Sequence, residues 1–136
     1  MKKARNILAA AVVLAVVGTA AQADFYLTGD MHRDVTSSHT TGILYNDSTA
    51  DVLAAGYISS AYVNHTALLR VMRPSGDAVG TAKAYNAARI NISSGTVPHL
   101  YAYDTSNVDI SGGNVNNLDA YDTSTVNISG GSVYGL

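Results

Sequence analysis

The chain has 136 residues with ten aspartates, no glutamate, no cysteine and only eight lysines plus arginines, for a formal net charge of -2. Without cysteine, disulfides are excluded. Nucleic acid is a poor partner, because phosphate binding requires clustered lysine and arginine. Aspartate without glutamate favours turns over helices, which points away from an α-helical fold.

The first 23 residues have the pattern of a secretory signal peptide. A basic start precedes an apolar stretch of 11 residues (7–17), and Ala-Gln-Ala then leads to a predicted cleavage between Ala23 and Asp24. The stretch is shorter than the roughly 20 residues that span a bilayer, so we expect no transmembrane segment after signal removal. The mature chain keeps five basic residues against ten aspartates, a net charge of -5, and is the size of one domain.

Residues 24–41 lack the repeat described below and are predicted to form an N-terminal cap or lead-in strand. Within them, the segment from Gly29 to His32 is similar to the first metal-binding element of calcineurin-type phosphoesterases. The later elements of such a two-metal site are missing, so we expect no metal. The other histidines, His39, His65 and His99, show no ligand spacing with His32 and are expected at the surface.

Two degenerate repeats follow, at 43–60 and 61–82. Both contain a tyrosine, Tyr45 or Tyr62, followed by a turn sequence and an apolar strand. The spacing of 23 residues from Tyr62 to Tyr85 implies an insertion of about five residues, which we place around Met72-Arg73-Pro74, where proline disrupts a ladder.

Three regular repeats of 18 residues close the chain, at 83–100, 101–118 and 119–136, and the last two agree at 12 of 18 positions. A fixed period with apolar residues two apart predicts stacked β-coils that bury their inner faces against their neighbours. No helical periodicity accompanies them. We therefore predict an all-β fold, a single-stranded parallel β-helix of about five coils over residues 42–136.

Alternation within the repeat separates an inner from an outer face. In the middle copy the predicted inward residues are Leu100, Ala102, Ser106, Val108 and Ile110. Ser111-Gly112-Gly113 breaks the strand and returns Val115 to the inside. Asp104-Thr105-Ser106 makes the other corner.

Stacking places equivalent residues in columns along the axis. The predicted core columns are Ile90, Val108 and Val126 beside Ile92, Ile110 and Ile128. A predicted outward column holds Asp51, Asn91, Asp109 and Asn127, whose side chains could pair along the axis.

Tyr85, Tyr103 and Tyr121 form a predicted outward column with two interpretations. Tyrosine is a good strand former, which alone explains its recurrence. Alternatively, the column is a ligand stripe that binds sugars or another surface.

Catalytic patterns are weak in this sequence, and we expect no enzyme and no cofactor. Asp104 and Asp122 recur with the repeat, which favours a turn role over the paired carboxylates of a glycosidase. The Gly-Gly pairs match neither phosphate loops nor calcium-binding β-rolls. A pectate-lyase-like, polysaccharide-binding or polysaccharide-degrading β-helix stays the alternative. An ice-binding face, suggested by Thr123-Ser124-Thr125, is a third hypothesis.

The segment LDAYDTSTVNISGGSV, within residues 118–133, resembles the degenerate repeats of secreted bacterial β-helix proteins, namely autotransporter-passenger-like adhesins and proteins with a PEP-CTERM sorting tail. The resemblance covers about residues 43–136. It implies a right-handed parallel β-helix, secretion or display at the cell surface, and a structural or adhesin-like role. Surface polysaccharide is the expected partner, or self-association through an open last coil. The chain ends at Leu136 on a complete coil, without barrel or sorting tail, which suggests a fragment of a longer array or a bare end that associates.

Overall fold

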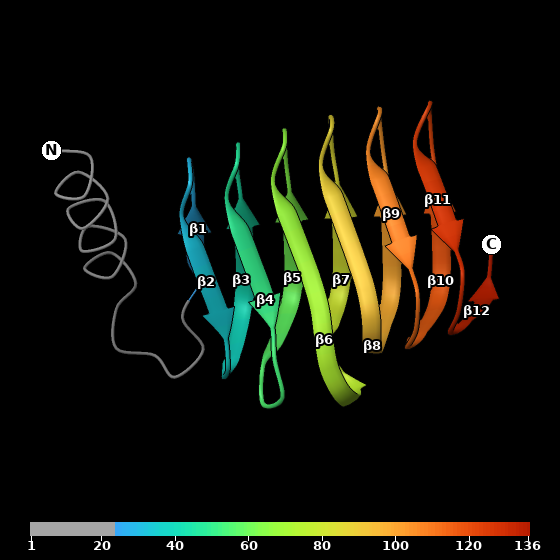
Figure 1. Ribbon diagram of the computed structural model, residues 1–136, viewed down its shortest axis with the longest axis horizontal. Coiled ribbons are helices and arrows are strands. Elements are labelled where there is room, and N and C mark those ends of the chain that lie inside the picture. The colour runs from blue at the N-terminus through green and yellow to red at the C-terminus, as the bar shows by residue number, and fades with distance from the viewer. Residues whose placement is uncertain (1–23) are drawn as a thin grey trace, which may run out of the picture.

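A computed structural model describes residues 24–136; the predicted signal peptide lies outside the described residues (Figure 1). The described chain folds entirely into strands and turns, without a helix. The strands are β1 (Phe25–Leu27), β2 (His32–Val35), β3 (Ser38–Leu44), β4 (Thr49–Val52), β5 (Tyr57–Val63), β6 (Leu68–Asp77), β7 (Val79–Ala84), β8 (Arg89–Ala102), β9 (Asn107–Ile110), β10 (Asn114–Ala120), β11 (Thr125–Ile128) and β12 (Ser132–Gly135).

The strands form two parallel ladders that face each other, which confirms the predicted β-solenoid (Figure 1). The front ladder contains β2, β4, β6, the first part of β8, β9 and β11. The rear ladder contains β1, β3, β5, β7, the second part of β8, β10 and β12. Front strands run down and rear strands run up while the chain advances from left to right, so the winding is right-handed.

Residues 24–41 form a first coil of the same kind. Their strands β1 and β2 pair in parallel with β3 and β4, and Val35 lies opposite Val52. The front ladder therefore has six strands, and the solenoid has about six turns rather than the five predicted.

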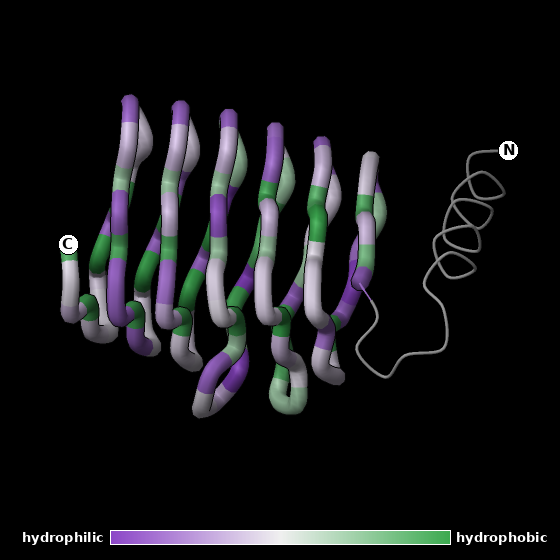
Figure 2. The backbone as a smooth tube through the Cα atoms, turned by 180° about the vertical axis from the view of Figure 1, so that it is seen from behind, coloured by the Kyte–Doolittle hydropathy of each residue, from purple (hydrophilic) through white to green (hydrophobic). Residues whose placement is uncertain are grey.

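The core lies between the ladders and is built from the predicted inward columns (Figure 2). Ile90, Val108, Ile92 and Ile110 are at most 1 % exposed, and Val115 is buried as predicted after the glycine break. Each such side chain contributes about 1.5–3 kcal/mol on burial. In the last coil the prediction fails, because no described coil covers it: Val126 is only half-buried and Ile128 is 48 % exposed.

Every coil turns one corner through a residue in the left-handed region. The residues at this corner, with φ between 54° and 65°, are Gly29, Asn46, His65, Asn86, Asp104 and Asp122. Apart from His65, they are glycine, asparagine or aspartate, the residues that tolerate this conformation best. The predicted corner at Asp104 is confirmed.

Both residues of each Gly-Gly pair are required, for different reasons. A Cβ on Gly112 would overlap the carbonyl oxygen of Ser93 in the preceding coil. Gly113 has φ of 75°, and a Cβ there would lie 2.5 Å from the carbonyl oxygen of Gly95. The glycines thus allow consecutive coils to approach closely where the chain passes between ladders.

The predicted insertion is confirmed in place but is smaller than expected. The strand register shifts between Val71 and Met72 and again before Asp77, which produces a loop at the lower edge of the solenoid (Figure 1). Corner residues His65 and Asn86 are 21 positions apart, three more than the regular repeat.

Tyr62 was assigned to the wrong column. It pairs with Ile43 and Lys83, whereas Asn64 occupies the position before the corner where the other coils carry Tyr45 or Tyr85. Matching the repeats by tyrosine alone caused the error, because outward strand positions accept several residue types.

Within residues 24–136, no helix has the length and apolar character needed to cross a membrane.

Candidate functional site

The predicted tyrosine column is a stack of parallel rings. Tyr85 and Tyr103 have ring centroids 4.9 Å apart and planes within 4° of each other. Tyr103 and Tyr121 are also 4.9 Å apart, with planes within 6°. This separation matches the spacing of neighbouring strands, about 4.8 Å, so the ladder itself sets the stacking distance.

Face-to-face stacking determines what this column can offer to a ligand. Both faces of Tyr103 are covered by its neighbours, which leaves ring edges and hydroxyl groups toward solvent. Burial, together with Tyr85, Tyr121, Tyr101 and Asp119, raises the pKa of Tyr103 above the usual value of 10.0. The column therefore presents neutral phenol edges rather than open platforms for a sugar ring.

A second outward column runs beside the tyrosines and carries a positive charge. The Lys83 ammonium lies 5.7 Å from the ring centroid of Tyr62 and 5.6 Å from that of Tyr101. Tyr101 in turn lies 6.4 Å from Tyr103, ring centroid to ring centroid. The two columns together make one aromatic strip along the rear ladder.

The outward column of the front ladder is polar, as predicted, and includes two residues that the sequence analysis did not assign to it. Register places Asp34 and Arg70 in line with the predicted Asp51, Asn91, Asp109 and Asn127. The Asn127 amide donates to the Asp109 carboxylate over 2.9 Å. The Arg70 guanidinium donates two hydrogen bonds of 2.7 Å to Asp51. These bonds connect successive coils from outside.

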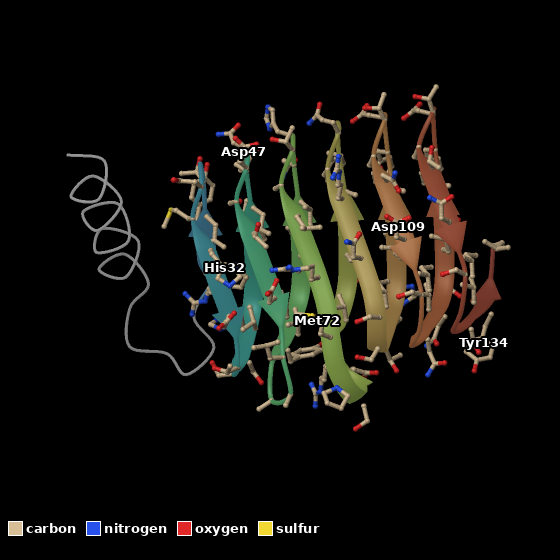
Figure 3. All side chains as sticks on the ribbon, in the orientation of Figure 1. His32, Asp47, Met72, Asp109 and Tyr134 are labelled. Carbon is tan, nitrogen blue, oxygen red and sulfur yellow. The ribbon has the colours of Figure 1, made fainter. Side chains whose placement is uncertain are left out.

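His32 lies at the N-terminal end of this polar column (Figure 3). Its Nε2 atom is 2.9 Å from Asp34 Oδ1 and 3.9 Å from Asp51 Oδ2. One ligand atom from each of the three residues lies within 4.8 Å of the others. We call this group the His32 cluster.

The recurring aspartates at the corners bond to the preceding coil. Asp104 accepts a hydrogen bond of 2.8 Å from the backbone N–H of Asn86, and Asp122 accepts one of 3.2 Å from that of Asp104. Thr105 and Thr123 donate through their hydroxyl groups to carbonyls of the same corners. The turn role predicted for Asp104 and Asp122 is confirmed.

A shallow hollow of about 250 Å³ lies beside the inserted loop. Serine, threonine, asparagine, proline and glycine residues line it, and it carries no charged side chain. Such a lining offers hydroxyl and amide groups for hydrogen bonds but no general acid or base.

The prediction for His39 was wrong, because this side chain is only 6 % exposed. It lies edge-on to Phe25 at 5.1 Å between ring centroids, and its Nε2 atom is 3.3 Å from the Arg33 guanidinium. Arg33 and His39 occupy inward positions in register with Ala50 and Ile58. The first coil thus closes the core with polar side chains. His65 and His99 are exposed, as predicted.

Comparison of the chain with models of protein families, with curated proteins and with solved structures found no match.

Sequence reasoning identified the tyrosine column but missed the His32 cluster. The signal was present as His-x-Asp, which places two ligands on one face of a strand. The third residue, Asp51, follows Asp34 by 17 positions, close to one repeat. Aligning residues 24–41 as a first coil would have brought the three together.

Proposed function

We propose that this chain is an exported, non-catalytic β-solenoid with a structural or adhesin-like role at the cell surface or in the extracellular matrix. One observation carries the proposal: the regular outward side chains bond to the neighbouring coils. Tyrosine rings stack on one another, and the corner aspartates hold the backbone of the preceding coil. This arrangement favours a stiff rod over a reaction centre.

The repeat resemblance supports the same role. Autotransporter-passenger-like and PEP-CTERM-associated repeats imply display at the cell surface, and the pattern of residues 1–23 is that of a signal peptide. We propose that export proceeds with cleavage before Asp24. Mass spectrometry of the chain recovered from an expressing bacterium tests this step. A new N-terminus at Asp24 outside the cytoplasm supports it, and an uncleaved cytoplasmic chain contradicts it.

Absence of catalysis is tested by incubating the protein with a panel of plant and bacterial polysaccharides and measuring new reducing ends and unsaturated products. We expect none above background. Turnover that disappears in Asp104→Asn would defeat the proposal and make the polysaccharide-degrading alternative correct.

A polysaccharide-binding role is the second candidate, and the aromatic strip on the rear ladder favours it. Its neutral hydroxyl edges and the Lys83 ammonium can hydrogen-bond to sugar hydroxyls. Tyr103→Phe keeps the stacked ring and removes one hydroxyl. Weaker saccharide binding by this variant in calorimetric titration supports the candidate, and the absence of binding by the unmodified protein removes it.

Self-association is the partner that the last coil supports. Four of the five exposed large hydrophobic residues of the described chain lie there: Tyr121, Ile128, Tyr134 and Leu136. An uncovered strand edge with apolar neighbours favours pairing with another β-coil. In sedimentation velocity, Ile128→Lys should reduce association. Equal sedimentation of a monomeric unmodified protein and the variant contradicts this proposal.

A further inference from the structure

The His32 cluster has the donor set of a transition-metal site. His32 and Asp34 lie two residues apart on the outward face of β2, and Asp34 stands opposite Asp51 on β4. Two ligands at i and i+2 with a third on the neighbouring strand converge on one point above the sheet. We propose that His32, Asp34 and Asp51 bind a divalent transition-metal ion, with zinc as the best fit.

The distances between the ligand atoms agree with this assignment. Zinc binds imidazole nitrogen at about 2.0–2.1 Å and carboxylate oxygen at about 2.0–2.2 Å, which in a tetrahedral site separates the ligand atoms by roughly 3.4 Å. The observed separations from His32 Nε2, 2.9 Å to Asp34 and 3.9 Å to Asp51, bracket this value. Small rotations of the exposed His32 and Asp34 side chains make the three distances equal.

Arg70 holds the third ligand in place. Its two hydrogen bonds of 2.7 Å fix the Asp51 carboxylate, whose side chain is 11 % exposed. Outer partners of this kind orient the ligands of metal sites. Each carboxylate oxygen has a second lone pair, so Asp51 can accept from Arg70 and bind a metal at once.

Charge and donor type select the class of metal. Asp34 and Asp51 carry two negative charges and Arg70 one positive charge, which leaves a net charge of -1 beside a neutral imidazole. Calcium and magnesium prefer sites of oxygen ligands alone, with six or more positions. A nitrogen donor with two oxygen donors suits zinc and the other divalent ions that accept imidazole, with the fourth position left to water.

Zinc titration of the whole chain, followed by isothermal calorimetry, tests the proposal. We expect one zinc ion per chain for the unmodified protein, at least tenfold weaker binding in His32→Ala and in Asp34→Asn, and unchanged binding in His99→Ala. His99 is the matched control, since it is also exposed on a strand but lies outside the cluster. Titrations with calcium and magnesium should give no comparable binding.

Two outcomes would overturn the proposal. The first is no stoichiometric zinc binding by a protein whose circular dichroism shows the β-fold. The second is equal zinc affinity in the unmodified protein and a folded His32→Ala variant. X-ray absorption of the zinc-loaded protein adds a structural readout: one nitrogen and the remaining oxygen donors support the site, and several nitrogen donors place the ion on other histidines.

Discussion

At the residue scale, the glycines that pass the chain between ladders are the most constrained positions. Gly113 and Gly29 share the left-handed conformation, with φ of 75° and 65°. Only at Gly113 does the neighbouring backbone fill the space of a Cβ; nothing lies within 4 Å of that position at Gly29.

Alanine at these two glycines should therefore have unequal effects. Gly29→Ala should lower the free energy of unfolding by about 1–2 kcal/mol, the cost of the left-handed conformation alone. Gly113→Ala should lower it further, because its Cβ also overlaps the Gly95 carbonyl. Urea denaturation measures both. Equal losses would show that the coils do not approach each other as closely as described.

Tyr103 makes stability depend on alkaline pH. Burial raises the pKa of its phenol above 10.0, so the folded state favours the neutral ring. The folded chain then binds more protons than the unfolded chain, and stability falls as the pH rises from 10 through the raised pKa. Below pH 10 this effect is absent.

In Tyr103→Phe the decrease of stability above pH 10 should be smaller than in the unmodified protein. Urea midpoints measured over a series of alkaline pH values provide the comparison, and ultraviolet titration of the phenolate follows the ionisation directly. If Tyr103 ionises at or below its usual pKa, the stacked column does not exist in solution as described.

At the scale of the strand, position along the stack decides how much a core residue stabilises. Ile110 on β9 and Ile128 on β11 belong to one column and are chemically equivalent. Ile110 is 1 % exposed because coils lie on both sides, whereas Ile128 is 48 % exposed.

Truncation should reveal this difference. Ile110→Ala should lower the free energy of unfolding by about 2–5 kcal/mol, the range for buried large-to-small changes. Ile128→Ala should cost less, because its side chain is half in solvent already. Chemical denaturation of both variants under identical conditions tests this order. A larger loss for Ile128→Ala would mean that another coil covers β11 in solution.

The regular strands could be predicted from sequence, and the first coil could not. Residues 83–136 repeat both the apolar alternation and the corner residues, so strands, corners and columns followed directly. In the first coil, Arg33 and His39 occupy inward positions and Gly29 replaces the corner asparagine or aspartate. Polar inward residues break the alternation on which strand prediction rests.

The candidate sites differ in the same way. The tyrosine column was predictable because identical residues recur at a constant spacing of 18. The His32 cluster joins unlike residues across two coils, and its members are neighbours only once the register of β2 against β4 is known. The Arg70 partner of Asp51 lies one coil further on, after a repeat whose length is not 18.

At the scale of the whole molecule, the two ends of the stack differ in chemistry. The first coil presents Arg33 and His39 at inward positions, and burial lowers the pKa of the Arg33 guanidinium. The last coil presents Val126, Ile128 and Val133. A polar inward face resists the addition of another coil, whereas an apolar one favours it. Growth or association of the solenoid should therefore proceed from the β11 and β12 end.

The central claim is that consecutive 18-residue units lie in parallel register, one on another. Nuclear Overhauser spectroscopy of the isotopically labelled protein tests it most directly. The account predicts cross-peaks between backbone protons of β9 and β11 around Val108 and Val126, together with contacts between the rings of Tyr103 and Tyr121. Cross-peaks confined to residues three or four apart, or pairing of these strands in antiparallel register, would contradict it.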